Sequence, residues 1–415
     1  MTSPALPTLL CLAIFCLPTT VHAHLPELYG REYRRVDPLA EIIPNRALDA
    51  GPSTLPSEEE KAIAALLDAA ESRGGAYDQG QADPLINLAQ LRLARDDASG
   101  AAEAYRQAIH LVRVNEGLYS RGQLPLLRAL MALYREAGNL PALGDAAGYY
   151  FRVLNPAAQD LSGENLVRSL EYLRWEREIY ASRRDGEQLP HLLRAYRANE
   201  ALLSQAAGES DANAYLELVF SQMRNLYLIL GEKPLEMKAD TRTPTETALN
   251  GIQRTGQSTG VKLLESALAW LDDTTSVTQA RVYLERGDWY QWNGQSRRAG
   301  AAYAEVVALL SKAGEEALLA DWLGEAIEIP DERDLWPLLT EESRRPPVVV
   351  EARYRVTASG DVRSVSVTTA REEDEWQANR VRRMLLDTHF RPRIGPLGPE
   401  PTPEVTRYYR LLNLR

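Results

Sequence analysis

The chain has 415 residues, of which 45% are apolar and 25% charged, which is enough material for about two or three globular domains. Its net charge of -11 argues against nucleic acid as a partner, because phosphate binding needs clustered lysine and arginine. Both cysteines, Cys11 and Cys16, lie in the first 23 residues, so the rest of the chain has no thiol for a disulfide or a thiolate metal site.

Residues 1–23 have the features of a signal peptide. The short apolar core "TLLCLAIFCL" is followed by small residues, Val21 and Ala23, where cleavage would release a mature chain that begins at His24. The core is shorter than the roughly 20 apolar residues of a membrane span. We therefore expect an exported, periplasmic protein with no transmembrane span in its mature chain. No lysine or arginine precedes the core, which leaves an uncleaved membrane anchor as the alternative.

Residues 24–56 show little periodicity and predict a flexible, proline-rich lead-in. Its prolines are Pro26, Pro38, Pro44, Pro52 and Pro56. Ordered structure is predicted to begin at Ser57, which forms a capping-box pattern with Glu60 at the start of a helix.

Residues 57–327 read as helices separated by short breaks, and two segments share one spacing of small and aromatic residues. The first contains Ala89, Ala101, Tyr105 and Ala108, and the second contains Gly287, Tyr290, Gly294, Ala299, Tyr303 and Val306. A weaker match has Tyr134 and Gly138. A further helix start is predicted at Thr243, with Pro244 at the first helical position and Glu246 completing a capping box.

This spacing resembles the tetratricopeptide repeat (TPR), in which small residues lie where two antiparallel helices touch and an aromatic side chain packs into the neighbouring repeat. The resemblance implies a mainly α solenoid with a concave groove that binds a protein or peptide. In that family the first helix of each pair lines the groove, which selects Asp83, Gln90, Arg128, Arg135, Arg281, Asp288, Gln291 and Trp292 here. The alternative for each is a solvated helix face, and for Trp292 a place in the core.

Residues 328–347 are rich in proline and charge and predict a linker to a last domain at 348–415. The stretch "VVVEARYRVTASGDVRSVSVTTA" alternates apolar and polar residues around Gly360-Asp361, which predicts a β-hairpin. A helix follows, with Ala378, Val381, Leu385 and Thr388 on one face, and "EVTRYYRLLNL" predicts a last strand. The expected fold is a small α+β domain of order β-β-α-β.

This order, with Gly360 in the hairpin and Phe390 and Pro392 after the helix, resembles the C-terminal domain of the TonB family. The resemblance implies that the domain binds another protein by adding a strand to a sheet edge. The implied edge is the last strand, Val405 to Leu412, with Val405, Arg407, Tyr409 and Leu411 as contact residues. The same edge also offers a route to a homodimer.

Nothing in the sequence predicts catalysis, a cofactor or a metal site. The histidines do not form an H-E-x-x-H pattern, and no serine stands in a G-x-S-x-G elbow. A copper site at an N-terminal His24 would need a second nearby histidine on a rigid scaffold. We therefore expect a non-enzymatic adaptor for envelope proteins or peptides. The alternatives are a TonB-type energy transducer with an uncleaved membrane anchor and a cell-envelope enzyme or metalloprotein.

Overall fold

The computed structural model of the chain describes residues 33–36, 58–137, 139–154, 164–181, 188–206, 212–232, 243–271, 276–330 and 348–411. The predicted signal peptide, most of the proline-rich lead-in, Ser57, Gly138 and residues 331–347 of the predicted linker lie outside these ranges. Within them, every helix is too short or too polar to cross a lipid bilayer.

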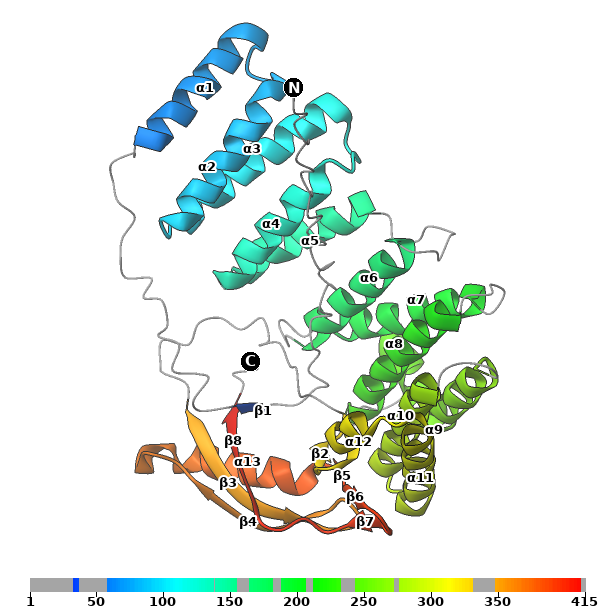
Figure 1. The fold of residues 1–415 in the computed structure, drawn as a ribbon. Coiled ribbons are helices and arrows are strands. Elements are labelled where there is room, and N and C mark those ends of the chain that lie inside the picture. The colour runs from blue at the N-terminus through cyan, green and yellow to red at the C-terminus, as the bar shows by residue number, and fades with distance from the viewer. Residues whose placement is uncertain are drawn as a thin grey trace, which may run out of the picture.

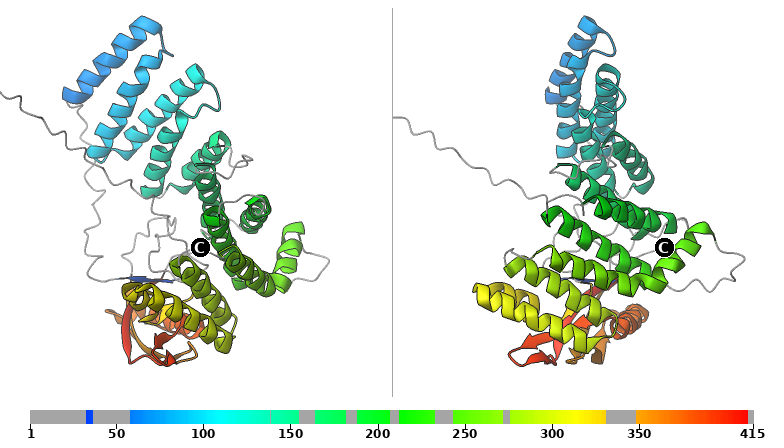
Figure 2. Two further views of the ribbon diagram at one scale, coloured as in Figure 1. Left: turned by 45° about the vertical axis from the view of Figure 1, so that its right-hand side comes forward. Right: turned by 90° about the vertical axis from the view of Figure 1, so that its right-hand side faces the viewer.

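Most of the described chain is α-helical, and the helices follow one another in a curved stack (Figures 1 and 2). In chain order they are α1 (Glu58–Gly74), α2 (Ala82–Ala94), α3 (Ala98–Glu116), α4 (Gln123–Glu136), α5 (Leu140–Leu154), α6 (Glu164–Ala181), α7 (Leu189–Ala206), α8 (Ala212–Gly231), α9 (Pro244–Ala269), α10 (Ser276–Trp292), α11 (Ser296–Ala313) and α12 (Glu316–Leu323). The predicted capping box at the start of α9 is confirmed, because the Thr243 and Glu246 side chains each accept a hydrogen bond from the other's backbone N–H.

Consecutive helices pack closely where the sequence supplies small residues. Ala89 and Ala101 are fully buried where α2 meets α3. Between α10 and α11, Gly287 lies directly against the ring of Tyr303, and a β-carbon at residue 287 would overlap that ring. The chain then turns at Gly294, whose φ of 70° is in the left-handed region that glycine tolerates best.

A small antiparallel sheet follows the helices and lies beside the last of them (Figure 1). It contains β3 (Val349–Val356), β4 (Val362–Thr368) and β8 (Val405–Leu411), together with β1 (Tyr33–Val36) from the N-terminal part of the chain. The strand order is β1-β8-β3-β4. The predicted fold class, mainly α with a small C-terminal α+β domain, is therefore confirmed.

Helix α13 (Glu375–Asp387) covers one face of this sheet, with Ala378, Val381 and Leu385 buried as the sequence pattern predicts. Thr388, predicted on the same helical face, instead follows the helix in an extended conformation. The β-β-α-β prediction omitted short strands. Among the described residues, β5 (Phe390–Arg391), β6 (Arg393–Gly395) and β7 (Gly398–Glu400) separate α13 from β8, and β2 (Ile327–Glu328) pairs with β5. These strands are two or three residues long, too short to show an alternating pattern in a sequence.

The hairpin between β3 and β4 ends against helix α10. Gly360 has a φ of 82°, and a side chain there would overlap the Gln291 amide and the Phe390 carbonyl. Its N–H donates to the Thr357 carbonyl (2.9 Å), and its carbonyl accepts from the Phe390 N–H (3.2 Å). Glycine at this position thus allows the sheet domain to touch the helical stack.

Candidate protein-binding surfaces

The arginines predicted to line a groove on α4 are paired with the neighbouring helix α6. Arg128 lies 3.0 Å from Glu171, and its Nε also donates to the Tyr150 hydroxyl (2.7 Å). Two turns later, Arg135 lies 2.8 Å from Glu178. Both side chains thus join α4 to α6, the next helix but one along the chain, and a partner would have to compete with these carboxylates to bind them.

The same arrangement continues from α6 through α8 to α10. Arg177 on α6 is buried and donates to the Asn225 side chain on α8 (2.9 Å). Arg281 on α10 lies 3.3 Å from Glu217 on α8, and its guanidinium sits 4.4 Å from the centre of the Phe220 ring. We call this series of cross-helix contacts from α4 to α10 the polar ladder.

Asp83 and Gln90 on α2 differ from the other predicted groove residues. Both are exposed. They are thus the members of the predicted groove set that a partner could contact without first displacing a cross-helix ion pair.

Asp288 and Gln291, also predicted to line the groove, are instead buried against the C-terminal domain. Arg391 of β5 donates its Nε to Asp288 Oδ1 (2.8 Å) and its Nη2 to Oδ2, and its Nη1 donates to the Trp322 carbonyl (2.7 Å). The Tyr303 hydroxyl also donates to Asp288 Oδ1 (2.9 Å). Gln291 Nε2 donates to the carbonyl of Ser359 in the β3–β4 hairpin. These side chains hold the two parts of the chain together.

Trp292 lies in an aromatic cluster rather than on an open surface. Its ring stacks on Trp289, with centroids 5.8 Å apart and 20° between the ring planes, and meets Tyr227 edge-on at 5.3 Å. The side chain is half-buried against the core of the stack. The sequence left two places open for Trp292, the groove and the core. The packing of its ring favours the core.

Substituting Trp292 with alanine is expected to destabilise the fold by about 1–3 kcal/mol, because a half-buried aromatic loses its packing partners. Urea denaturation followed by far-UV circular dichroism measures this change. Trp376 on α13 is 59% exposed, and Trp376→Ala is the control, expected to change stability by less than about 0.5 kcal/mol. Equal effects of the two substitutions would show that Trp292 is not part of the core.

An acidic side chain on α10 lies near the Asp288–Arg391 contact, which we call the junction between the helical stack and the C-terminal domain. Burial and the neighbouring carboxylate of Asp288 raise the pKa of Glu285 to about 7, and Arg224, Arg391 and Arg281 oppose part of the shift. Because Glu285 changes its charge near pH 7, the stability of the junction should depend on pH in that range.

The pKa of Glu285 gives a signed prediction. Because the folded pKa lies above the ordinary value of 4.5, the folded chain binds this proton more tightly, and the stability due to Glu285 is lost as pH rises from about 4.5 through about 7. Glu285→Gln should therefore gain stability relative to the parent over that interval, and the difference should level off above it. Urea denaturation from pH 5 to 8 tests this, with the exposed Glu305→Gln on α11 as the control. A difference that does not vary with pH would contradict the prediction.

Strand β8, predicted as the exposed edge for a partner, is the second strand of the sheet. Its inner side pairs with β3, where Tyr354 faces Val405, Ala352 faces Arg407 and Val350 faces Tyr409. Its outer side pairs with β1, in the register Tyr33↔Leu411, Arg34↔Arg410, Arg35↔Tyr409 and Val36↔Tyr408. The prediction of a bare edge along the whole of β8 is thus corrected: its C-terminal half already carries a strand.

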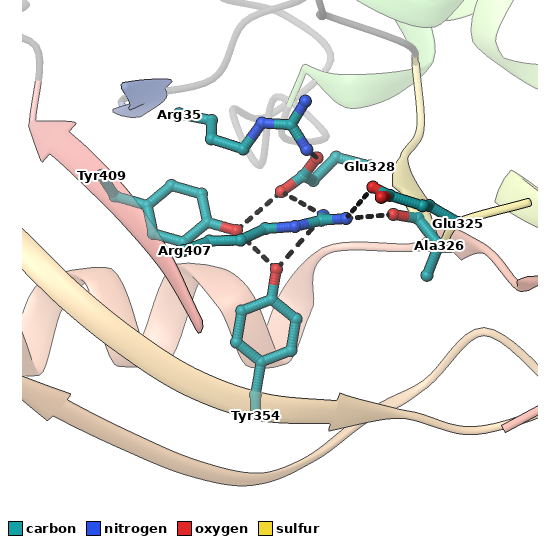
Figure 3. Close-up of polar contacts among 7 residues, drawn as sticks. All are labelled: Arg35, Glu325, Ala326, Glu328, Tyr354, Arg407 and Tyr409. Atoms are coloured by element: carbon teal, nitrogen blue, oxygen red, sulfur yellow. Dashed lines mark hydrogen bonds and ion pairs between the residues drawn. The ribbon is translucent and has the colours of Figure 1, made fainter. Parts of the chain in front are cut away.

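Two of the predicted contact residues on β8 point into a buried polar cluster (Figure 3). Arg407 Nη1 donates to Glu328 of β2 (3.3 Å), and its Nη2 donates to the Ala326 carbonyl (2.5 Å). The Tyr409 hydroxyl donates to the same Glu328 Oε1 (2.7 Å) and lies 2.6 Å from the Tyr354 hydroxyl. Arg407 and Tyr409 therefore tie β8 to β2 instead of facing a partner.

The electrostatics of this polar cluster keep Arg407 charged and Tyr354 protonated. Burial raises the pKa of Tyr354, and Glu328 raises it further. Burial lowers the pKa of Arg407, but Glu328 and the two tyrosines outweigh it, so the net shift is upward. The cluster is thus a fixed set of donors around one carboxylate.

Arg35 of β1 completes the cluster from the outer side of β8. Its Nη1 lies 3.8 Å from Glu328 Oε2, while Arg407 and Tyr409 donate hydrogen bonds to Oε1. The Arg35 side chain is 32% exposed and that of Glu328 is 7% exposed. Figure 3 shows the Arg35 guanidinium approaching Glu328 from the side opposite Tyr354. A strand on this edge therefore places a cation over a buried carboxylate.

No model of a known protein family matches this sequence, and no curated protein is similar enough to count as a relative. Among the residues that the structure describes, no three histidine, cysteine, aspartate or glutamate side chains gather as a metal site would require. The fold and its contacts therefore carry the functional argument.

Sequence reasoning missed the residues that matter most at the two junctions. Arg391 pairs with Asp288 across 103 positions, and Tyr409 bonds Glu328 across 81. Arg35 and Glu328 fell in segments interpreted as a lead-in and a linker. One signal was present: Arg407 occupies a position where the alternation of the last strand predicts a buried side chain, which indicates a buried partner of opposite charge.

Proposed function

We propose that this chain is a periplasmic, non-enzymatic adaptor that brings two partners of the cell envelope together. Its helical stack would serve as a TPR-like solenoid that binds one protein or peptide. Its last domain would serve as a TonB-like module that binds another by strand addition. Residues 1–23 would direct export and then be cleaved from the mature chain.

The packing of the repeat-like positions supports the TPR-like part of the proposal. Ala89, Ala101, Tyr105 and Tyr303 are all buried at helix contacts, and Gly287 makes room for the ring of Tyr303. Stacked helix pairs of this kind expose an extended surface for recognition. The exposed Asp83 and Gln90 are the positions on that surface where we place the first contact with a partner.

A single observation carries the strand-addition part: the outer side of β8 accepts a strand from the opposite end of the chain. The edge therefore has the backbone geometry to pair with an added extended segment. In the register given above, β1 faces Tyr408 to Leu411, whereas β3 pairs with β8 from Val405 to Arg410. The outer side of β8 from Val405 to Arg407 carries no strand among the described residues.

Fractionation and intact mass test the location. The full chain is expressed in a bacterial host with a cell envelope, and a soluble periplasmic species that begins near His24 is expected. An uncleaved species in the inner membrane would favour an energy transducer over an adaptor.

Site-specific photo-crosslinking in the same cells tests the binding function. A photoreactive residue replaces Gln90 on the stack or Thr406 on β8, both of which are exposed. Each should capture a discrete protein, and a different one at each position. The exposed Arg106 on α3 is the matched control position. Crosslinks no more specific than those from Arg106 would refute the adaptor function.

A further inference from the structure

We propose that β1 is the chain's own ligand for the β8 edge, and that a partner binds there by displacing it with an extended segment carrying an arginine or lysine at the position of Arg35. This inference rests on the proposed strand-addition function and specifies its partner and its regulation. The partner class is an extended peptide segment of another protein, recognised by its backbone and by one cation.

The pairing between β1 and β8 is short. Strand β1 has four residues and β8 has seven, so β1 covers only part of the edge. β1 is the terminal strand of its sheet, so its backbone is held by strand pairing on one side only. A longer segment that also pairs with Val405 to Arg407 would make more backbone hydrogen bonds than β1 makes. A longer segment should therefore bind the β8 edge more tightly than β1 does.

The side chain opposite Tyr409 gives this edge a chemical preference. Arg35 stands there and directs its guanidinium to Glu328 Oε2, in an environment where Glu328 is almost entirely buried. A neutral side chain at this position would leave that oxygen without the cation, and an acidic one would set two carboxylates against each other. The edge therefore selects segments with a cation at this point in the register.

Strand β1 can leave the edge without unfolding the domain. Arg407 and the Tyr409 hydroxyl donate to Glu328 Oε1, whereas Arg35 approaches the other oxygen, Oε2. The sheet keeps β3 on the inner side of β8, and α13 still covers its face. The loss of β1 thus exposes a binding edge while the buried network that positions the edge stays intact.

The test uses the full chain, a variant that lacks residues 33–36, and a fluorescein-labelled peptide with the sequence of residues 31–38, REYRRVDP. Fluorescence anisotropy should show that the peptide binds the deletion variant at least tenfold more tightly than the parent chain, whose edge is occupied. Replacing the arginine that corresponds to Arg35 by glutamate should weaken binding at least tenfold. The same change at the arginine corresponding to Arg34, which the register sets opposite Arg410, should weaken it less than threefold.

Equal affinity for the two chains would overturn the proposal that β1 occupies the edge, and equal effects at the two arginines would overturn the cation requirement. A light-scattering mass that falls from dimer to monomer on deletion of residues 33–36 would overturn the intramolecular form, because β1 would then be the ligand of a second copy. Glu328→Gln should abolish the preference for arginine over glutamate, and circular dichroism is the control that checks whether this variant folds.

These outcomes are separable from those of the adaptor function. A Thr406 crosslink to a partner that is equally strong with and without β1 would support the adaptor and refute self-occupancy. Peptide binding to the deletion variant without any partner crosslink would support the edge site and refute the adaptor.

Discussion

Arg391→Met is expected to lower the free energy of unfolding by about 3–5 kcal/mol, because it leaves the buried carboxylate of Asp288 without its cation. Arg391 is 1% exposed and Asp288 is 5% exposed, so water does not replace the lost partner. Methionine keeps most of the side-chain volume, so the loss reports charge and hydrogen bonds rather than a cavity. Urea denaturation followed by tryptophan fluorescence measures it, since Trp289 adjoins Asp288 on α10.

Two further variants make the Arg391 result specific. Adding Asp288→Asn should restore most of the lost stability, because the amide carries no charge and its oxygen can still accept a hydrogen bond from the Tyr303 hydroxyl. Arg393→Met removes an exposed arginine two residues away that lies 3.6 Å from Glu400, and should cost less than about 1 kcal/mol. If Arg391→Met cost no more than Arg393→Met, the junction would not depend on the buried pair.

Trp289→Ala is expected to lower the free energy of unfolding by about 3–5 kcal/mol, the usual loss when a fully buried large aromatic is truncated. The indole is 0% exposed, its Nε1 donates to the Gln257 carbonyl of α9 (3.0 Å), and its ring meets Tyr227 edge-on at 4.9 Å. Its loss would remove packing between α8, α9 and α10 at once.

A glycine on α9 supplies a sharper test of the same contact. Gly260 lies against the Trp289 ring, and a β-carbon there would come within 2.5 Å of Cε2. Gly260→Ala should therefore destabilise the parent chain by about 1–3 kcal/mol through overpacking. In the Trp289→Ala background the same substitution should stabilise by about 1 kcal/mol, because the space is empty and alanine favours a helix. An effect of the same sign in both backgrounds would contradict the packing that the structure shows.

The sequence by itself determined the local elements of this protein. Period 3.6 hydrophobicity gave the helices, the Thr243–Glu246 pair gave the start of α9, and alternation around Gly360 gave the β3–β4 hairpin. The buried face of α13 also follows from spacing alone. These features depend on interactions within a few residues, which a sequence displays directly.

Only the tertiary structure decided how these elements meet. The pairing of β1 with β8, the burial of Asp288 against Arg391 and the approach of Arg35 to Glu328 join segments far apart in the chain. Asp288 has the sequence context of a solvated helix position and is buried only because β5 brings a guanidinium to it. A four-residue strand has too few positions to show a period, and its pairing depends on backbone hydrogen bonds and on the approach of Arg35 to Glu328. Strand β8 was therefore visible in the sequence, but the segment that pairs with its outer side was not.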